Sequence, residues 1–219
     1  MSAWYDESLF TRWQDKGYAQ KFRVDRVLFE DKSEHQDVVV FETPLFGRVL
    51  AIDGIIQTTE RDEFAYHEMM AHVPILAHGN ASKVLVIGGG DGGIMREVLR
   101  HPGVALCHMV DIDDMVVEIS KKYLPSLSGG VFDNPRGTVV IADGCKFVKE
   151  TEARYDVVIV DSTDPIGPGA VLFTEEFYAD CRRCMTPGGI MVTQSGVPFA
   201  QREEFPETRM RLQKIFKDA

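Results

Sequence analysis

Residues 84–93 read Val-Leu-Val-Ile-Gly-Gly-Gly-Asp-Gly-Gly, and this stretch decides the fold. The four apolar residues in a row predict a strand that is buried on both faces, as in a parallel sheet. The glycines that follow allow a sharp turn and let a ligand approach the backbone closely. Residues 94–100 then show the apolar spacing of a helix. A strand, a glycine turn and a helix in this order form the first half of a nucleotide-binding βαβ unit.

The chain after this stretch continues the alternation of strands and helices. Its pattern predicts strands at 83–88, 105–110, 138–142, 156–161 and 189–194, and helices at about 93–101, 113–123, 144–151, 174–184 and 202–216. Such alternation is typical of an α/β fold with a doubly wound, mostly parallel, Rossmann-like sheet. A further helix is expected at 61–78, with Phe64, Ala65, Met69, Ala71 and Val73 supplying its apolar faces and Pro74 bending or ending it.

The N-terminal part of the chain has the period-two pattern of strands. Short β-rich runs at 38–41 and 48–52 alternate with turn signals at 43–47 and 53–54. We therefore expect a small antiparallel β domain within residues 1–60, followed by a Rossmann-like catalytic domain over 61–219. A β unit of this size is too small to be stable alone, so it should pack on the next domain or on a second subunit.

Composition and charge narrow the functional class. The 219 residues include 34 acidic and 24 basic residues, a formal charge of −10, and no long basic run, which argues against a nucleic-acid partner. No apolar run reaches membrane-spanning length and no signal peptide pattern is present, so we expect a cytoplasmic protein with reduced thiols. Cys181 and Cys184 have CxxC spacing, but they lie in a helical pattern without a second pair, which favours packing in the core over a zinc or redox role.

Aspartates follow four of the predicted strands. Asp91, Asp111, Asp143 and Asp161 each stand at or just after a strand's carboxyl end, where ligands bind in doubly wound sheets. Asp111 comes twenty residues after Asp91, about where a ribose-binding acid is expected. Taken singly, Asp111 and Asp143 could each cap the next helix, and Asp164, which precedes a proline, could form an Asx turn. Together they predict one binding crevice.

The acid inside the glycine turn indicates the charge of the ligand. A dinucleotide site offers bare amides to a pyrophosphate, and Asp91 would repel that anion. The ligand is therefore expected to carry a cation at this point. An S-adenosyl sulfonium compound has adenine, ribose and a positive charge without a phosphate, and these parts match the aspartates at the strand ends.

Three segments, 50–69, 84–93 and 161–168, resemble those of the polyamine aminopropyltransferase family, in particular the bacterial-type spermidine synthases. The resemblance extends from the β unit to Gln201. It implies a transferase of polyamine biosynthesis that moves an aminopropyl group from decarboxylated S-adenosylmethionine to putrescine, giving spermidine and methylthioadenosine. No metal and no other cofactor are implied. The resemblance also implies a homodimer or homotetramer, with the N-terminal β unit as a contact.

The resemblance implies roles on the amine side of the site. Asp161 would be the proton acceptor, Asp91 would hold the aminopropyl amine, and Asp164 would help to bind the acceptor amine. Tyr66 and His67 would line the putrescine side. Without the resemblance, a helical histidine such as His67 is more often a packed core residue.

The resemblance also implies roles on the nucleoside side. Asp111 would bind the ribose, Asp143 and Gly144 the adenine, and Pro168 would border the nucleoside in the loop that covers the site. The full set of implied nucleoside-binding residues is Gln36, Gly88, Gly90, Asp111, Asp143, Gly144 and Pro168.

The chain departs from the family pattern in two places. The ribose-binding acid is commonly a glutamate, and Asp111 is one methylene shorter, so the nucleoside would sit deeper or use a water molecule. The family fold also continues with two more strands and a further tyrosine beyond the point that corresponds to Ala219. This predicts a C-terminally truncated member, incomplete in its catalytic domain, with an exposed strand edge and weak or no activity.

Three alternatives stay open. A putrescine N-methyltransferase would share the nucleoside site, but Asp91 would repel the carboxylate of ordinary S-adenosylmethionine. An aminopropyltransferase for another amine would differ in pocket length, which the sequence does not show. A non-catalytic scaffold subunit is the third alternative, and the intact aspartates argue against it.

Overall fold

The centre of the molecule is a five-stranded parallel sheet with the strand order β11-β10-β7-β8-β9. The computed structural model describes residues 3–8, 18–162, 167–196, 201–202 and 204–219. From β7 in the middle, the chain runs outward through β8 and β9 on one side and then through β10 and β11 on the other. The direction of winding reverses between β7 and β10, which makes this pair the switch point of the sheet. The strands are β7 (Lys83–Gly88), β8 (Leu106–Asp111), β9 (Gly137–Ile141), β10 (Tyr155–Asp161) and β11 (Met185–Thr193).

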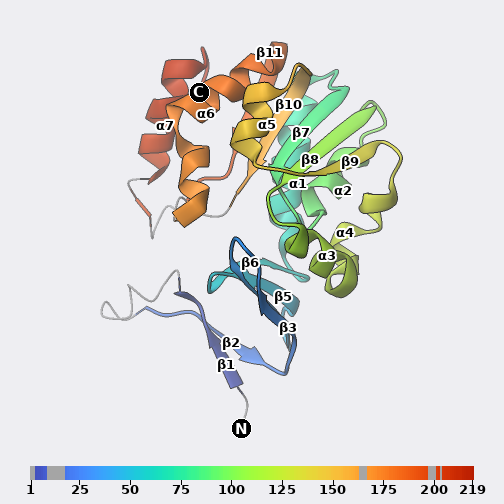
Figure 1. Ribbon diagram of the computed structural model, residues 1–219, viewed down its shortest axis with the longest axis vertical. Coiled ribbons are helices and arrows are strands. Elements are labelled where there is room, and N and C mark those ends of the chain that lie inside the picture. The colour runs from blue at the N-terminus through green and yellow to red at the C-terminus, as the bar shows by residue number, and fades with distance from the viewer. Residues whose placement is uncertain (1–2, 9–17, 163–166, 197–200, 203) are drawn as a thin grey trace.

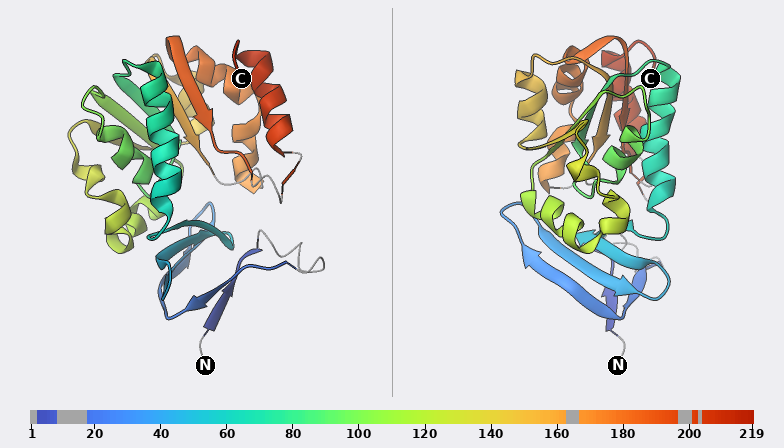
Figure 2. Two further views of the ribbon diagram at one scale, coloured as in Figure 1. Left: turned by 180° about the vertical axis from the view of Figure 1, so that it is seen from behind. Right: turned by 90° about the vertical axis from the view of Figure 1, so that its right-hand side faces the viewer.

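Helices cover both faces of this sheet (Figures 1 and 2). One face packs against α1 (Glu63–His78) and α2 (Gly93–Leu99). The other face packs against α5 (Gly144–Glu150), α6 (Glu175–Arg183) and α7 (Glu204–Ile215). The predicted doubly wound α/β fold is therefore confirmed. β11 begins earlier than expected, at Met185, because its pairing with β10 includes an irregularity that takes up the extra residues.

Strand β7 is buried on both faces, as its sequence predicts. Val84, Leu85, Val86 and Ile87 are at most 2% exposed. Val84 and Val86 belong to the cluster under α1 and α2, whereas Leu85 and Ile87 belong to the cluster on the opposite face. Alternate side chains of one strand thus join both halves of the core.

A second, antiparallel sheet is formed by β3 (Arg26–Lys32), β4 (Asp37–Thr43), β5 (Gly47–Ile52) and β6 (Ile55–Thr59). Side chains of β4 and β5, among them Val40 and Leu50, pack against α3 (Asp114–Tyr123) and α4 (Pro125–Ser128). The expected packing of the small β unit on the next part of the chain is confirmed. Beside this sheet, β1 (Ala3–Asp6) pairs with β2 (Lys21–Val24) as an antiparallel ribbon. The alternation of Phe22 and Val24 with charged residues indicated β2, whereas no pattern in the sequence indicated β1.

Helix α1 extends to His78, as predicted, so Pro74 does not end it, and Gly79 caps it in the left-handed conformation. Of the residues expected to supply its apolar faces, only Ala71 is buried. Phe64, Met69 and Val73 are all more than half exposed. The residues that face the core are His67, Met70, Ala71, Pro74 and Ile75.

The four cysteines are free thiols. Cys181 and Cys184 are buried against the sheet, which confirms that the CxxC spacing belongs to a packed helix. Burial raises the pKa of Cys184 to about 11 and that of Cys107 to about 12. Within the described residues, no helix has both the length and the apolar character that a membrane span needs.

Candidate active site

A pocket of about 350 Å³ opens at the carboxyl ends of the parallel strands, between the two sheets. Asp164 lies outside the described residues, and Pro168 lies in η3 (Gly167–Phe173), whose residues Gly169, Val171 and Leu172 border the pocket. The other predicted site residues all line it. They are Gln36, Tyr66, His67, Gly88, Gly90, Asp91, Asp111, Asp143, Gly144 and Asp161.

The floor of the pocket is the switch point between β7 and β10. Gly88 pairs with Asp161 across the two strands and has a positive φ of 82°. A Cβ atom at Gly88 would lie 1.8 Å from the carbonyl oxygen of Asp161, which no real side chain tolerates. Glycine is therefore required at this position, and the close approach fixes Asp161 beside the glycine turn.

Asp161 is held by Tyr66 from helix α1. The Tyr66 hydroxyl donates a hydrogen bond of 2.6 Å to Asp161 Oδ1. Desolvation and the nearby charge of Asp91 raise the pKa of Asp161 from 3.8 to about 6, although His67 and the Tyr66 hydrogen bond oppose the shift. The result is a carboxylate that is ionised at neutral pH and more basic than an ordinary aspartate.

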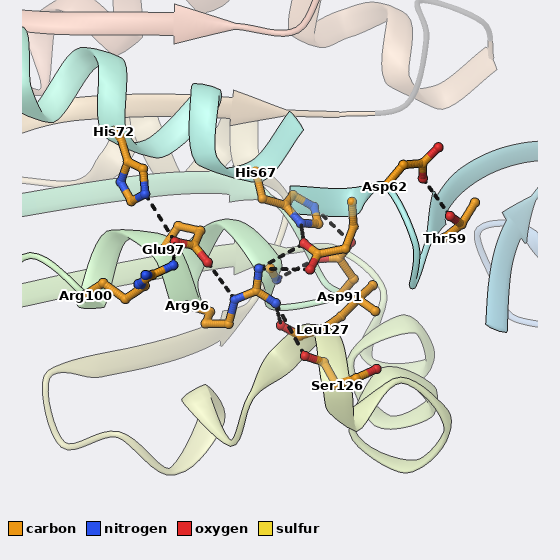
Figure 3. A network of polar contacts seen from close by, with 12 residues as sticks. Thr59, Asp62, His67, His72, Asp91, Arg96, Glu97, Arg100, Ser126 and Leu127 are labelled. Carbon is orange, nitrogen blue, oxygen red and sulfur yellow. Dashed lines mark hydrogen bonds and ion pairs between the residues drawn. The ribbon is translucent and has the colours of Figure 1, made fainter. Parts of the chain in front are cut away.

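Asp91 is nearly buried, with 8% of its surface exposed, and both of its oxygens have partners. Oδ1 accepts a hydrogen bond of 2.7 Å from the Gly93 amide. Oδ2 lies 3.3 Å from Nε2 of His67, as Figure 3 shows. His67 itself is 2% exposed, so it is both a core residue and a wall of the pocket.

Asp111 occupies the end of β8. Its Oδ1 accepts a hydrogen bond of 2.9 Å from the amide of Asp113. A Cβ at Gly90 would lie 2.7 Å from Asp111 Oδ2, so the turn leaves room for this carboxylate only because residue 90 is glycine. Desolvation raises the pKa of Asp111 to about 6, although the hydrogen bond from the Asp113 amide lowers this pKa.

Asp113 does not line the pocket, but it holds Gln36, which does, and the sequence did not reveal this contact. It is 1% exposed and caps helix α3 by accepting a hydrogen bond of 3.0 Å from the Met115 amide. Its other oxygen accepts hydrogen bonds from the Ser33 hydroxyl at 2.6 Å and from Nε2 of Gln36 at 2.9 Å. Because the Gln36 amide nitrogen is engaged, its oxygen is the atom left to accept from a ligand. Asp113 thus connects the N-terminal sheet to the nucleoside side of the pocket.

Asp143 both caps a helix and lines the pocket. Its Oδ1 caps helix α5 by accepting hydrogen bonds from the amides of Cys145 and Lys146. The residue also lines the pocket together with Gly144. Its role as a helix cap therefore does not remove it from the pocket wall.

Several other residues line the pocket without having been predicted. Asp53 and Gln57 come from the N-terminal sheet, and Ser162 follows Asp161 at the end of β10. Asp53, Gln57 and Ser162 all lie inside the segments that carry the family resemblance. Their position in those segments was the only feature of the sequence that could have indicated a place in the pocket. For Asp113 the only local signal was a helix start, because its partners Ser33 and Gln36 are 80 and 77 residues away.

A group of potential metal ligands lies outside the pocket. Among the described residues, Glu68, His72 and Glu97 bring donor atoms within 4.8 Å of one another. The two oxygens of Glu97 already accept hydrogen bonds from Arg96 at 2.8 Å and from Arg100 at 2.7 Å. A carboxylate that two guanidinium groups neutralise is a poor ligand for a cation.

Comparison with known families identifies the family to which the chain belongs. Residues 63–219 match the model of the spermine/spermidine synthase domain, and residues 8–60 match that of the spermidine synthase tetramerisation domain. The chain belongs to the spermine/spermidine synthase family. The expected family is confirmed, and the protein is an aminopropyltransferase of polyamine biosynthesis.

Individual relatives agree with this family. The chain is 56% identical over 214 residues to polyamine aminopropyltransferase 1 of Pseudomonas aeruginosa, covering 98% of this chain and 73% of that protein. It is 56% identical over 201 residues to a polyamine aminopropyltransferase of Serratia proteamaculans, covering 92% of this chain and 70% of that one.

Solved structures of spermidine synthases have the same fold. A spermidine synthase in complex with the transition state analogue AdoDATO matches with a TM-score of 0.92 and 42% identity, over 98% of this chain and 72% of that one. The spermidine synthase from Thermotoga maritima matches with a TM-score of 0.90 and 41% identity, over 98% and 71% of the two chains.

Replacing Asp113 should destabilise this aminopropyltransferase more than the loss of a helix cap alone. In Asp113→Ala, helix α3 loses its cap, at about 1 kcal/mol, and the amide of Gln36 loses a buried acceptor, at about 1–3 kcal/mol. The free energy of unfolding in urea should therefore fall by about 2–4 kcal/mol. Thr174→Ala is the matched control, because Thr174 caps α6 and has no contact with Gln36 or with the N-terminal sheet among the hydrogen bonds described. Equal losses in the two variants would show that the connection between the sheets adds no stability.

Proposed function

We propose that this aminopropyltransferase transfers the aminopropyl group of decarboxylated S-adenosylmethionine to putrescine, giving spermidine and methylthioadenosine without a metal or other cofactor. The observation that carries the proposal is the charge of the pocket. Among the described residues that line it, five are aspartates and none is a lysine or arginine. They are Asp53, Asp91, Asp111, Asp143 and Asp161. Such a pocket suits a sulfonium donor and a diamine, both cations.

The nucleoside part of the donor fits the side of the pocket that β8 and β9 form. In the proposed complex, the Asp111 carboxylate accepts hydrogen bonds from the ribose hydroxyls, and Gln36 contacts the nucleoside through its amide oxygen. Asp143 and Gly144 face the adenine. The glycines at 88 and 90 let the nucleoside approach the backbone, and the loop that contains Pro168 covers it.

The amine part of the reaction fits the side near β7 and β10. Asp91 binds the ammonium of the aminopropyl group, which the decarboxylated donor carries without a neighbouring carboxylate. Tyr66 and His67 line the side where putrescine enters, and Asp164 helps to bind its amine. The names of the two solved relatives, both spermidine synthases, support putrescine as the acceptor.

The chemical step is a displacement at the methylene next to the sulfonium. The amine nitrogen forms a bond to this carbon, the carbon–sulfur bond breaks, and its electron pair stays on sulfur as a neutral thioether. The amine loses a proton to Asp161. The pKa of Asp161 is raised from 3.8 to about 6, whereas the pKa of an alkylammonium is near 10. The difference between the two pKa values thus falls from roughly six units to about four, which makes the proton transfer less unfavourable. Alignment of nitrogen, carbon and sulfur supplies the rest of the acceleration.

A homodimer or homotetramer is part of the same proposal. Residues 8–60 match a domain whose description names tetramerisation, and this segment includes the antiparallel sheet. We therefore place the contact between subunits on the N-terminal sheet. Sedimentation of the purified protein measures the number of subunits directly.

The first prediction of the proposal concerns products. The purified protein is incubated with decarboxylated or ordinary S-adenosylmethionine and with putrescine, cadaverine, agmatine or spermidine, and products are identified by mass. Decarboxylated donor with putrescine should give spermidine and methylthioadenosine at the highest kcat/KM. Methylputrescine from the ordinary donor would overturn the proposed reaction. A clear preference for another amine would overturn putrescine as the acceptor.

The second prediction concerns the proton acceptor. Asp161→Asn keeps the size of the side chain but cannot take up the proton, so kcat should fall by about 10²- to 10⁴-fold. The Kd for methylthioadenosine should change by less than about threefold, because the nucleoside contacts remain. Asp31→Asn, on the exposed surface of β3, is the control and should keep full activity. Near-full turnover in Asp161→Asn would exclude Asp161 as the acceptor.

The third prediction concerns pH. Asp161 accepts a proton only when it is ionised, and its pKa is raised to about 6. The kcat/KM for putrescine should therefore decrease by about tenfold per pH unit below about pH 6, and more steeply where Asp111 also becomes protonated. Measuring the Kd for methylthioadenosine over the same pH range separates the contribution of Asp111, because this ligand lacks the aminopropyl group and its ammonium. An activity that stays constant down to pH 4.5 would contradict the assignment.

A further inference from the structure

Glu63 lies behind the pocket, in the first turn of α1, and does not line it. Its Oε2 is 2.6 Å from Nδ1 of His67, one helical turn further along. Glu63 is only 11% exposed at its side chain, so this contact is shielded from water. A short, shielded contact of this kind fixes the orientation of the imidazole ring.

The other ring nitrogen of His67 faces Asp91. Nε2 lies 3.3 Å from Asp91 Oδ2. The two ring nitrogens thus face two carboxylates, and an ionised carboxylate only accepts hydrogen bonds. Both nitrogens must therefore carry a proton, and the ring is an imidazolium that donates to Glu63 on one side and to Asp91 on the other.

We propose that Glu63 is a positioning residue for Asp91: by accepting from Nδ1 of His67, it directs the Nε2–H of the ring at the carboxylate that binds the aminopropyl ammonium. The role of Asp91 in this statement rests on the proposed function. Glu63 itself touches neither substrate. Its effect on the reaction passes through His67.

Arg96 of helix α2 holds Glu63 in place. Its Nη2 donates to both oxygens of Glu63, at 3.1 and 2.9 Å, and its Nε donates to Glu97 at 2.8 Å. The same guanidinium reaches the carbonyl oxygens of Ser126 and Leu127 near α4, as Figure 3 shows. Arg96 thus links Glu63 on α1 to α2 and α4, and these contacts hold the Glu63 carboxylate in place.

The ring of His67 packs directly against Gly93. A Cβ at Gly93 would lie 2.2 Å from Nδ1 of His67, so the imidazole rests directly on the backbone of the glycine turn. The Gly93 amide also donates to Asp91 Oδ1. Both oxygens of Asp91 are thereby oriented before a ligand arrives, one by the turn and the other by His67, which lowers the cost of orienting the site on binding.

The charge of His67 is constant over the physiological pH range. Burial opposes protonation, but the charge of Asp91, the hydrogen bonds to Asp91 and Glu63, and the charge of Asp161 outweigh it and raise the pKa of His67 to about 10. The charged groups around the ring are Glu63 on α1, Asp91 in the turn between β7 and α2, and Asp161 on β10. Arg96 lies on the far side of Glu63. The contact is therefore a fixed support and not a pH switch.

The test uses Glu63→Gln, which keeps the shape of the side chain and removes its charge. The protonation of His67 is followed by NMR of its ring nitrogens, and the Kd is measured for decarboxylated S-adenosylmethionine and for methylthioadenosine. We expect the pKa of His67 to fall by at least one unit in the variant. Binding of the decarboxylated donor should weaken about tenfold, while binding of methylthioadenosine, which lacks the aminopropyl group, changes less than twofold.

The matched control is Glu118→Gln on α3, where the side chain is 68% exposed and pairs with Lys121. It should leave the pKa of His67 and both Kd values unchanged. If Glu63→Gln also leaves them unchanged, or weakens both ligands equally, Glu63 is not a positioning residue for Asp91. Equal weakening is the result that a merely structural role would give.

A second variant, Gly93→Ala, displaces His67 without removing any charge. It should cause the same selective loss of affinity for the decarboxylated donor, and retention of wild-type affinity would contradict the proposed arrangement.

Failure of the proposed function is distinguishable from failure of this inference. If the wild type makes no spermidine but Glu63→Gln still shifts the pKa of His67 and the donor Kd, the fault lies with the proposed reaction and not with Glu63.

Discussion

The structure depends on the close approach of two backbones at the centre of the parallel sheet. The carbonyl oxygen of Asp161 occupies the space where any residue other than glycine at position 88 would place its Cβ. This contact sets the register of β7 against β10 at the point where the sheet reverses its winding. Asp161 lies beside the glycine turn that carries Asp91 because this pair is in register. The position of the site is thus set by the packing of two main chains, and the side chains determine its chemistry.

The parts of the molecule that the sequence predicted are those with a local cause. A run such as 84–87 has only one stable environment, between two layers of helices, and the structure buries it there. Aspartates that follow parallel strands come together because parallel strands share a direction. The convergence of Asp91, Asp111 and Asp161 therefore followed from the fold class alone, without knowledge of a single contact.

The parts that the sequence did not predict depend on distant partners. Helix α1 has apolar residues on several sides, so its composition did not show that Met70 and Ile75, and not Met69, would face the sheet. The sequence placed Asp113 only at the start of a predicted helix, and only the folded chain brings Gln36 to its second oxygen. His67 could be read as core or as site, and the structure shows that one side chain is both.

The crowding of acids has a consequence for the exchange of ions with the solvent. Desolvation holds the pKa values of Asp111 and Asp161 at about 6, so in mildly acidic solution the empty pocket takes up protons. A cation that enters stabilises the ionised carboxylates and lowers those pKa values, so the protons leave as it binds. The pocket therefore acts as a small cation exchanger, in which protons and organic cations compete for the same charges.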